Sequence, residues 1–339
     1  MTKKPMRWKL SIIAIIAALS LSACNASTKS GDSSKYPEKP IVVVAPSGAG
    51  GGWDKTARSL TKVLTDTKLV SQALTVENKP GGGGAVFMAE YATKEVNNPY
   101  SLFVNSPPIL INNWKDSGNS PYGYKDTTPL AQLTKDYGAI VVGANSKYND
   151  MTSLLQDIKA DPTKITVAGG SAPGSMDHLI AVLPAFKFGI DPKSVKYVSY
   201  DGGGEAMAAL LGNNADVIAT DASSIGEYLK AGKIKVLGIT SPERLGGDLK
   251  DITTMKEQGI DAEFTIWRGL FGPKNLGKDE LAYWDKTIKE LVAKDEWKKE
   301  LQANGWESEY RNADEFKTFL GEQETLIKVL LDALGMVKK

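Results

Sequence analysis

The stretch VVVAPSGAGGGWDKTAR, residues 42–58, joins a strand pattern, a glycine-rich loop and the start of a helix. Its β-branched run predicts a buried parallel strand over 41–45, which Pro46 closes. Four glycines between positions 48 and 52 precede a helix predicted from about Trp53 to Leu64. Glycines let a backbone approach an anion, and a helix N-terminus offers unpaired N–H groups at the positive end of its dipole. The stretch therefore predicts an anion-binding loop, with a simple tight turn as the alternative.

The order of strand, loop and helix recurs along the chain. Further strands are predicted over 73–78, 100–105, 139–144, 164–170, 195–200, 216–221 and 234–240. After 240 the chain is predicted to be irregular, including WRGLFGPK at 267–274, before two helical segments at 278–303 and 312–337. Alternating strands and helices indicate parallel α/β sheets, which bind ligands at the carboxyl ends of their strands. We expect two α/β lobes, residues 37–142 with 239–339 and residues 143–238.

The first 36 residues differ in composition from the rest. Four basic residues precede an apolar run over 10–21, which predicts a secretory signal peptide over 1–23. The sequence LSAC at 21–24 resembles a bacterial lipobox, which implies lipidation of Cys24, the only cysteine of the chain. The alternative is a signal peptide cut elsewhere. Polar residues over 24–36 predict a flexible tether, so an extracytoplasmic location with a lipid anchor in the cell membrane is expected.

Charge argues against nucleic acid as a partner. The full chain has 41 basic and 40 acidic residues. The predicted signal peptide carries four basic and no acidic residues, so its removal leaves 37 basic and 40 acidic residues. No basic excess remains, and no Lys/Arg-rich run with interleaved aromatic residues is present.

Catalytic motifs are scarce. His178 is the sole histidine, and neither GxSxG nor HExxH occurs, although Ser171, Ser175 and Asp177 are close to it in sequence. Packing or capping is the favoured role of His178. Helix capping is likewise expected of the aspartates at loop-to-helix positions, namely Asp54, Asp177, Asp201 and Asp221. The glycine loop lacks a Walker motif, and Trp53 stands where a dinucleotide loop has glycine. The sequence predicts a binding protein without catalytic residues, cofactor or metal.

Several separate motifs carry a family resemblance from Tyr36 to the C-terminus. They are YPEKPIVVVAPSGAGGGWDKTAR (36–58), VENKPGGGGAVFMAE (76–90), VAGGSAPGSMDHLIA (167–181), YVSYDGGGEAMAALLGNNADV (197–217) and FTIWRGLFGPK (264–274). In order and spacing they resemble the TctC/Bug family, the solute receptors of tripartite tricarboxylate transporters. The resemblance implies a two-lobed type II periplasmic-binding-protein fold, a Venus flytrap with a central cleft. It also implies a monomer that delivers carboxylated solutes to a permease with one large and one small membrane subunit.

The resemblance assigns the ligand to loops of both lobes. In the first lobe these candidates are Ser47, Gly48, Ala49, Gly50, Gly51 and Trp53, joined by Asn105 at the end of a predicted strand. In the second lobe they are Ser171, Ala172, Ser175, Asp201 and Gly202. Asp54 is expected to brace the first loop, with a structural role for Arg58. Arg268 is the cationic candidate, because arginine pairs bidentately with carboxylates, and its alternative role is to brace the hinge against an acidic residue.

These observations predict a lipid-anchored receptor for a di- or tricarboxylate such as citrate. The alternatives are a receptor for another anion or an amino acid, a secreted hydrolase that uses His178, and a partner of a sensor kinase.

Overall fold

One long strand, β4 (Thr127–Gly143), runs through both β-sheets of the computed structural model, which describes residues 1–2, 36–118, 120–200 and 202–338. The predicted signal peptide, the lipidation site Cys24 and Asp201 lie outside the described residues. Pro37–Lys339 forms one compact unit, and the following description concerns this unit. Within the described ranges, no helix has the length and apolar character needed to cross a membrane.

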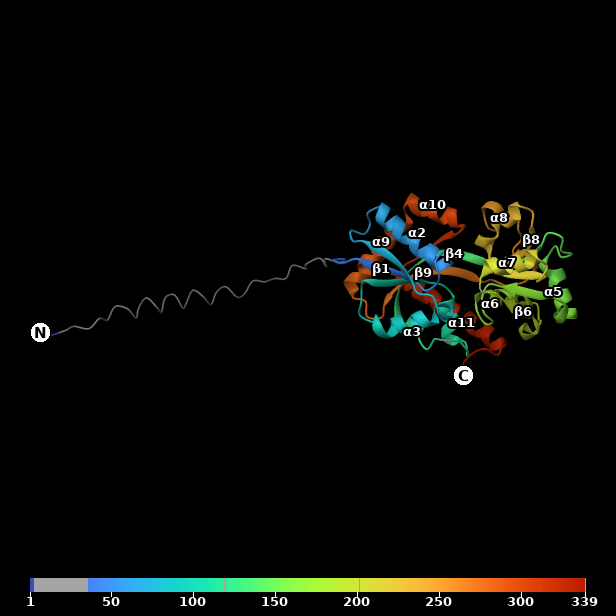
Figure 1. Cartoon of the computed structure of the whole chain (residues 1–339), viewed down its shortest axis with the longest axis horizontal. Helices are drawn as coiled ribbons and strands as arrows, with labels where there is room; N and C mark the ends of the chain where they lie inside the picture. Colours follow the sequence, from blue (N-terminus) through green and yellow to red (C-terminus); the bar gives the residue numbers. More distant parts are fainter. Residues whose placement is uncertain (3–35, 119, 201, 339) are drawn as a thin grey trace. The chain divides into compact units, whose positions relative to one another are not determined.

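The first sheet has the strand order β2-β1-β3-β9-β4, and β10 also pairs with β4. Its strands are β1 (Ile41–Ala45), β2 (Leu74–Asn78), β3 (Ser101–Asn105), β9 (Thr265–Pro273) and β10 (Glu307–Arg311). Strands β1, β2 and β3 are parallel, whereas β9 and β10 run antiparallel to β4. Its helices are α2 (Gly52–Asp66), α3 (Ala85–Lys94), α4 (Pro108–Trp114), α9 (Lys278–Val292), α10 (Asp295–Asn304) and α11 (Ala313–Ala333). Helix α10, near the C-terminus, lies against α2, so distant parts of the chain build one body (Figure 1).

The second sheet pairs the end of β4 with β7 and β8, and continues through β5 to β6. Its further strands are β5 (Thr166–Gly169), β6 (Lys196–Ser199), β7 (Val217–Asp221) and β8 (Ile234–Ile239). Its helices are α5 (Met151–Ala160), α6 (Met176–Lys187), α7 (Gly203–Leu211) and α8 (Gly226–Lys230), drawn from green to gold in Figure 1. Short 3₁₀ turns are Gly82–Gly84, Tyr124–Asp126, Pro162–Lys164, Pro192–Ser194, Ala222–Ser224, Gly247–Leu249 and Lys256–Gln258.

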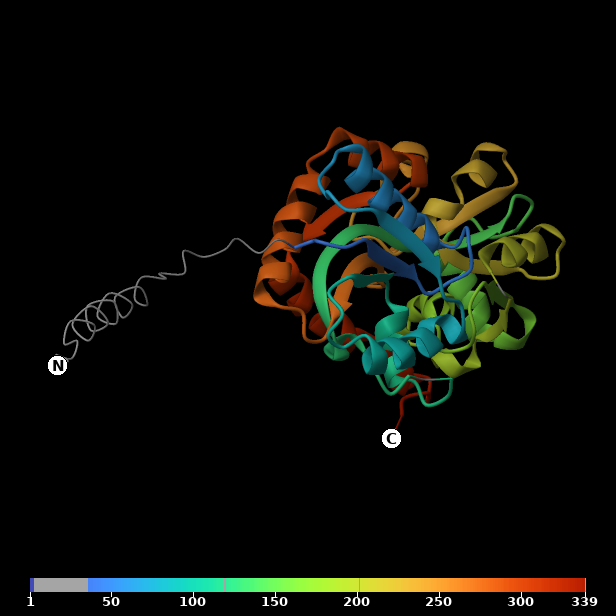
Figure 2. The same cartoon turned by 60° about the vertical axis from the view of Figure 1, so that its left-hand side comes forward.

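Strand β4 changes partners between two consecutive residues. Tyr137 pairs with Thr265 of β9, whereas Gly138 pairs with Asp221 of β7. Figure 2 shows β4 in green as a long, curved strand. Next to the switch the chain returns from β8, and Thr240 bonds to Gly138 twice: the Gly138 N–H donates to Thr240 Oγ1 and the Thr240 N–H donates to the Gly138 carbonyl, both at 2.8 Å. The two segments that connect the sheets are therefore tied together at this point.

A cluster of aromatic side chains forms part of the core beneath the first sheet. Phe103 stacks on Phe271 with ring centroids 5.1 Å apart, and Phe316 contacts both Phe271 and Trp267. All four side chains are buried. Aromatic side chains of this size each remove ~150–250 Å² from water and dominate core energetics. The stretch around Trp267, predicted to be irregular, is thus a strand that is buried from Ile266 to Pro273, and that prediction was wrong.

The loops after β5 and β6 meet at backbone distance. A Cβ on Gly170 would lie 2.1 Å from the Gly203 nitrogen, so no side chain fits there. Around Gly204, in the same helix α7, such an atom would meet nothing within 4 Å.

We predict that Gly170→Ala lowers the free energy of unfolding by roughly 1–3 kcal/mol, because a side chain must push the two loops apart. Gly204→Ala is the matched control and should leave stability unchanged or raise it, since alanine favours helix more than glycine does. Urea unfolding of both variants measures the difference. Equal midpoints for the two variants would show that the loops do not touch.

Candidate ligand-binding site

A cavity of about 470 Å³ opens where the strands of both sheets end. Its wall includes residues that follow or close five strands: Ser47 after β1, Ser106 after β3, Gly170 after β5, Gly203 after β6 and Asp221 at the end of β7. Carboxyl ends of strands are the usual ligand side of α/β sheets, and this volume suits a small molecule.

Three helices begin at the cavity. The wall contains Gly52 and Trp53 from the first turn of α2, Met176 from that of α6, and Gly203 from that of α7. Each N-terminus contributes unpaired N–H groups and the positive end of a helix dipole. Because these helices come from both sheets, an anion in the cavity is attracted from two sides.

The glycine loop before α2 is held by one carboxylate. Asp54 accepts the Gly50 N–H at 2.8 Å, the Asn78 amide at 2.9 Å and Arg58 Nε at 3.0 Å. The hydrogen bond from Arg58 lowers the pKa of Asp54 to about 2, with further help from the Gly50 N–H. Gly50 adopts a left-handed conformation with φ of 80°, which glycine tolerates. The expectation that Asp54 braces the loop is confirmed.

Trp53 contacts the loops that follow strands β2 and β3. Its Nε1 donates to Ser106 Oγ at 2.9 Å, and its ring lies against Gly84, where a Cβ would be 3.2 Å from Trp53 Cη2. The side chain is buried and forms part of the cavity wall. Its indole nitrogen is therefore satisfied by the protein, and the ring contributes an apolar surface.

Arg268 is the buried cation of the cavity. It lies on β9, is only 6% exposed and belongs to the wall. Its Nη2 is 3.5 Å from Asp221 Oδ2, while its Nε has no hydrogen-bond partner among the described residues. A Cβ on Gly52 would lie 2.8 Å from Arg268 Nη2, so the guanidinium fits beside α2 because residue 52 has no side chain. A buried donor without a partner costs about 1–3 kcal/mol, which an acceptor on a ligand would offset.

Three aspartates surround this cation. Asp177 accepts the Gly170 N–H at 2.7 Å, and Asp136 accepts the Tyr137 N–H at 2.7 Å. Burial, and then the charge of Asp221, raises the pKa of both Asp136 and Asp177 to about 7. Burial also raises the pKa of Asp221, which Arg268 opposes. The negative charge near Arg268 is therefore smaller at neutral pH than three ionised carboxylates would give.

His178 has a structural environment. Its Nδ1 accepts the Gly174 N–H at 2.8 Å, and its ring lies 4.5 Å from that of Tyr197. Burial lowers its pKa to about 4, so the imidazole is neutral at physiological pH. Because the backbone occupies Nδ1, His178 is not arranged as a general base toward the cavity.

The structure places the predicted site residues unevenly. In the cavity wall are Ser47, Gly50, Trp53, Ser171 and Arg268. Gly51, Ser175 and Gly202 are the residues before α2, α6 and α7, and Asn105 is buried, where its Oδ1 accepts the Ser106 N–H at 2.8 Å. Gly48, Ala49 and Ala172 also lie outside the wall. Ligand contact remains a prediction for every candidate residue, inside or outside the wall, and for Asp201.

Sequence reasoning missed several wall residues. They are Gly52, Lys55, Ser106, Pro108, Gly170, Met176, Asp177, Gly203, Gly204, Met207, Thr220, Asp221, Ser224 and Tyr228. Lys55 follows the glycine motif by one helical turn, and Asp221 ends a strand, but neither position alone shows that the side chain faces this cavity. The capping role expected of Asp54, Asp177 and Asp221 was wrong. Asp54 and Asp177 lie in the first turns of α2 and α6 and accept N–H groups of the preceding loops, and Asp221 caps no helix among the described residues.

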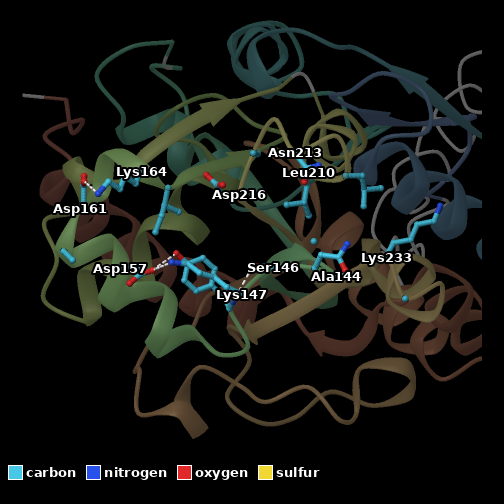
Figure 3. A pocket seen from close by; sticks show the side chains of 18 residues that line it. Ala144, Ser146, Lys147, Asp157, Asp161, Lys164, Leu210, Asn213, Asp216 and Lys233 are labelled. Carbon is cyan, nitrogen blue, oxygen red and sulfur yellow. Dashed lines mark hydrogen bonds and ion pairs between the residues drawn. The ribbon is translucent and has the colours of Figure 1, made fainter.

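A larger hollow of about 1,030 Å³ lies at the other end of the second sheet (Figure 3). Its wall includes Gly143, where β4 ends, and Ile165 and Asp216, which precede β5 and β7. Two of the three lysines in its wall are paired there, Lys147 with Asp157 at 2.5 Å and Lys164 with Asp161 at 3.1 Å, whereas Lys233 has no ion pair among the described residues. The paired side chains are largely exposed, and their charges compensate one another. The smaller cavity, which holds a buried cation, is therefore the candidate site.

Residues 57–336 match the family described as the tripartite tricarboxylate transporter family receptor, TctC. The chain belongs to this family. TctC receptors are binding proteins without catalytic activity that work with the membrane subunits of a tripartite transporter, and periplasmic relatives indicate an extracytoplasmic location. A Cupriavidus necator protein, the UPF0065 protein in the gbd 5′ region, is 28% identical over 344 residues, which cover 96% of each chain.

Solved structures of TctC receptors show the same mixed α/β periplasmic-binding-protein fold. A TctC solute-binding protein from Polaromonas is 26% identical with a TM-score of 0.71, covering 88% of this chain and 99% of its own. The periplasmic binding protein BugD is 25% identical with a TM-score of 0.74, covering 90% and 100%. Two Rhodopseudomonas palustris proteins share the fold at lower identity: MatC with bound malate (20%, TM-score 0.73, covering 87% and 100%) and a protein with adipate (18%, TM-score 0.77, covering 90% and 100%).

We predict that Asp54→Asn lowers the free energy of unfolding by roughly 1.5–3 kcal/mol at pH 7, because three donors lose a charged acceptor. The folded-state pKa lies below the unfolded one, so this stabilisation is present above about pH 4 and is lost as the pH falls toward 2. Urea unfolding at pH 7, 5 and 3 measures it.

Asp66→Asn, at the other end of α2, is the control. Its exposed pair with Lys62 should contribute less than about 1 kcal/mol. A constant difference between Asp54→Asn and the unmodified chain from pH 7 to pH 3 would contradict the assignment.

Proposed function

We propose that this TctC receptor is a lipid-anchored protein that binds a di- or tricarboxylate in the cavity between its two sheets. The observation that carries the proposal is the buried guanidinium of Arg268, whose Nε lacks a partner among the described residues and which faces the cavity where three helices begin. A carboxylate would supply the missing acceptor. Hydrogen bonds between two charged groups are about twice as strong as neutral ones, and the N–H groups of the helix ends would add to them.

The character of the cavity supports an acid of this class. Besides Arg268, the wall contains Lys55, an exposed cation that has no ion pair within the described ranges. Two cations at different depths suit a ligand with more than one carboxylate. The malate and adipate found in structures of the same fold are both dicarboxylates. A single carboxylate on an amino acid, or another anion, is the second candidate, because the helix ends do not discriminate among anions.

We also infer that the two sheets belong to two lobes that close over the ligand in a monomer, and that the chain first crosses between them at 137/138, five residues before the expected boundary at 142/143. The tie between Gly138 and Thr240 lies between the sheets, at the position that a hinge requires. Hinge closure is the usual way in which periplasmic binding proteins enclose a solute, and the large and small membrane subunits would recognise the closed form.

We predict that Arg268→Gln weakens binding of carboxylates by about 30-fold or more, since loss of a buried charged partner costs about 2–5 kcal/mol. Arg268→Lys keeps the charge without the planar fork, and its affinity should be intermediate. Titration calorimetry with citrate, tricarballylate, malate and succinate measures the affinities. At a hundredfold excess over Kd, a bound acid should also add about 2.7 kcal/mol of stability.

Arg244→Gln is the control for a lost guanidinium. Arg244 forms an exposed pair with Glu257 at 2.8 Å and is not part of the cavity wall, so its loss should leave affinity unchanged. Melting curves without ligand establish that each variant is folded. If no carboxylate binds the unmodified chain, or if Arg268→Gln binds as well as Arg244→Gln, the proposed function is wrong.

For the lipid anchor we predict that Cys24→Ser moves the receptor from the membrane fraction to the soluble extracytoplasmic fraction of a bacterial host. The reason is that the lipobox at 21–24 offers a single acceptor thiol. Fractionation followed by immunoblotting measures this. Membrane association that persists in Cys24→Ser would show that another segment holds the chain.

A further inference from the structure

Asp221 is an open hydrogen-bond acceptor in the cavity wall. It ends β7 and precedes the 3₁₀ turn Ala222–Ser224, yet its side chain caps no helix among the described residues. Asp150, Asp161 and Asp191 stand at comparable positions before helical turns, and each accepts a backbone N–H there. The Asp221 side chain is 25% exposed and its one ion pair within the described residues is the contact with Arg268. Its carboxylate oxygens are thus available to a ligand.

Each neighbouring carboxylate already accepts a backbone N–H. Asp177 accepts the Gly170 N–H, and Asp136 accepts the N–H groups of Tyr137 and Ser223. The hydroxyls of Thr220 and Ser224 lie 3.2 Å from each other, so one can donate to the other. Asp221 is therefore the acidic group of this wall whose carboxylate accepts no hydrogen bond from the described residues.

The contact between Asp221 and Arg268 leaves both groups unsatisfied. The two charges are 3.5 Å apart, and no hydrogen bond joins them within the described part of the chain. A guanidinium has five N–H donors and a carboxylate has about four acceptor positions, so each can take a further partner. A ligand carboxylate that pairs with Arg268 comes close to the like charge of Asp221. A donor on the same ligand, next to that carboxylate, would change this repulsion into a hydrogen bond.

We propose that the receptor selects acids that carry a hydrogen-bond donor, a hydroxyl or an ammonium, on the carbon adjacent to a carboxylate, and that Asp221 accepts from this donor while Arg268 holds the carboxylate. The inference rests on the proposed function and makes its ligand class narrower. The small distance between the two side chains requires that the two ligand groups be neighbours. A site built to receive a donor discriminates against the analogue that lacks it, because its own acceptor is then left buried without a partner.

Three C4 dicarboxylates test the proposal: succinate, malate and aspartate, which differ at one carbon by hydrogen, hydroxyl and ammonium. Citrate and tricarballylate form the matching C6 pair, since they differ by one hydroxyl. Calorimetry on the full chain, purified in detergent, should give at least tenfold tighter binding for malate or aspartate than for succinate, or for citrate than for tricarballylate. The acid that binds more tightly identifies the donor as hydroxyl or ammonium.

Variants at Asp221 assign the preference to this side chain. Asp221→Ala should reduce the tenfold ratio to about one, because it removes the acceptor from every complex. Asp221→Asn keeps a carbonyl acceptor without the charge, so it should keep part of a hydroxyl preference and lose an ammonium preference. If Asp221→Ala does not fold, Asp221→Asn alone tests whether the preference depends on this side chain. Asp261→Ala, at an 85% exposed aspartate outside the wall, is the matched control and should keep the full ratio.

The outcomes separate this inference from the proposed function. Equal binding of the substituted and unsubstituted acids by the unmodified chain would overturn the inference while the carboxylate receptor stands. A preference that survives unchanged in both Asp221 variants would overturn it as well. If none of the five acids binds, the proposed function fails first.

Discussion

Two hydrogen bonds between Gly138 and Thr240 hold the place where both sheets meet, and the cavity depends on them. They join β4, as it changes partners, to the segment that returns from β8. Gly138 has no room for a side chain, because a Cβ would lie 2.5 Å from Ile180 Cγ2 of α6. The strand can therefore pass from one sheet to the other only with its backbone pressed against that helix. A side chain at this position would separate the sheets and the loops that they carry.

This junction also explains why Arg268 and Asp221 meet. Arg268 pairs with Thr134 on the part of β4 that belongs to the first sheet, and Asp221 pairs with Gly138, the first residue that belongs to the second. The two strand partners are thus only four positions apart on β4, and the opposite charges of Arg268 and Asp221 lie 3.5 Å apart in the cavity wall. The helix ends around them supply partial positive charge without mobile side chains, and this preorganisation reduces the entropy lost when a ligand binds.

Much of the fold could be predicted from the sequence, because most strands are apolar and the loops after them are rich in glycine and other small residues. The alternation of strand and helix patterns between residues 41 and 105 predicted parallel strands. The glycine loops predicted that helices begin at the ligand site. Strand β9 could not be predicted from its pattern. Its glycines and polar residues resemble a loop, whereas its burial depends on pairing with β3 and β4, which are distant in sequence. The long continuation of β4 before 139 depends in the same way on β9 and β10.

The site was predictable in its loops and less so in its side chains. The loop at 47–53 and Arg268 were identified from motifs. The proposed role of Asp221 could not be, because aspartate before a helical turn is a preferred N-cap residue, and only the structure shows that this carboxylate caps no helix among the described residues. Likewise, the sequence around 55 gives no sign that Lys55 faces the same cavity as residues 170 and 221.

The absence of a side chain at position 52 has a consequence for how such receptors diverge. A Cβ on residue 52 would lie 2.8 Å from Arg268 Nη2, so a larger residue at 52 requires the end of the Arg268 side chain to leave its place beside α2. A receptor with a larger residue at 52 should therefore hold its cation at another point of the cavity or lack it. Positions 52 and 268 should therefore vary together among related receptors, and the pair would then separate groups of receptors that bind different solutes.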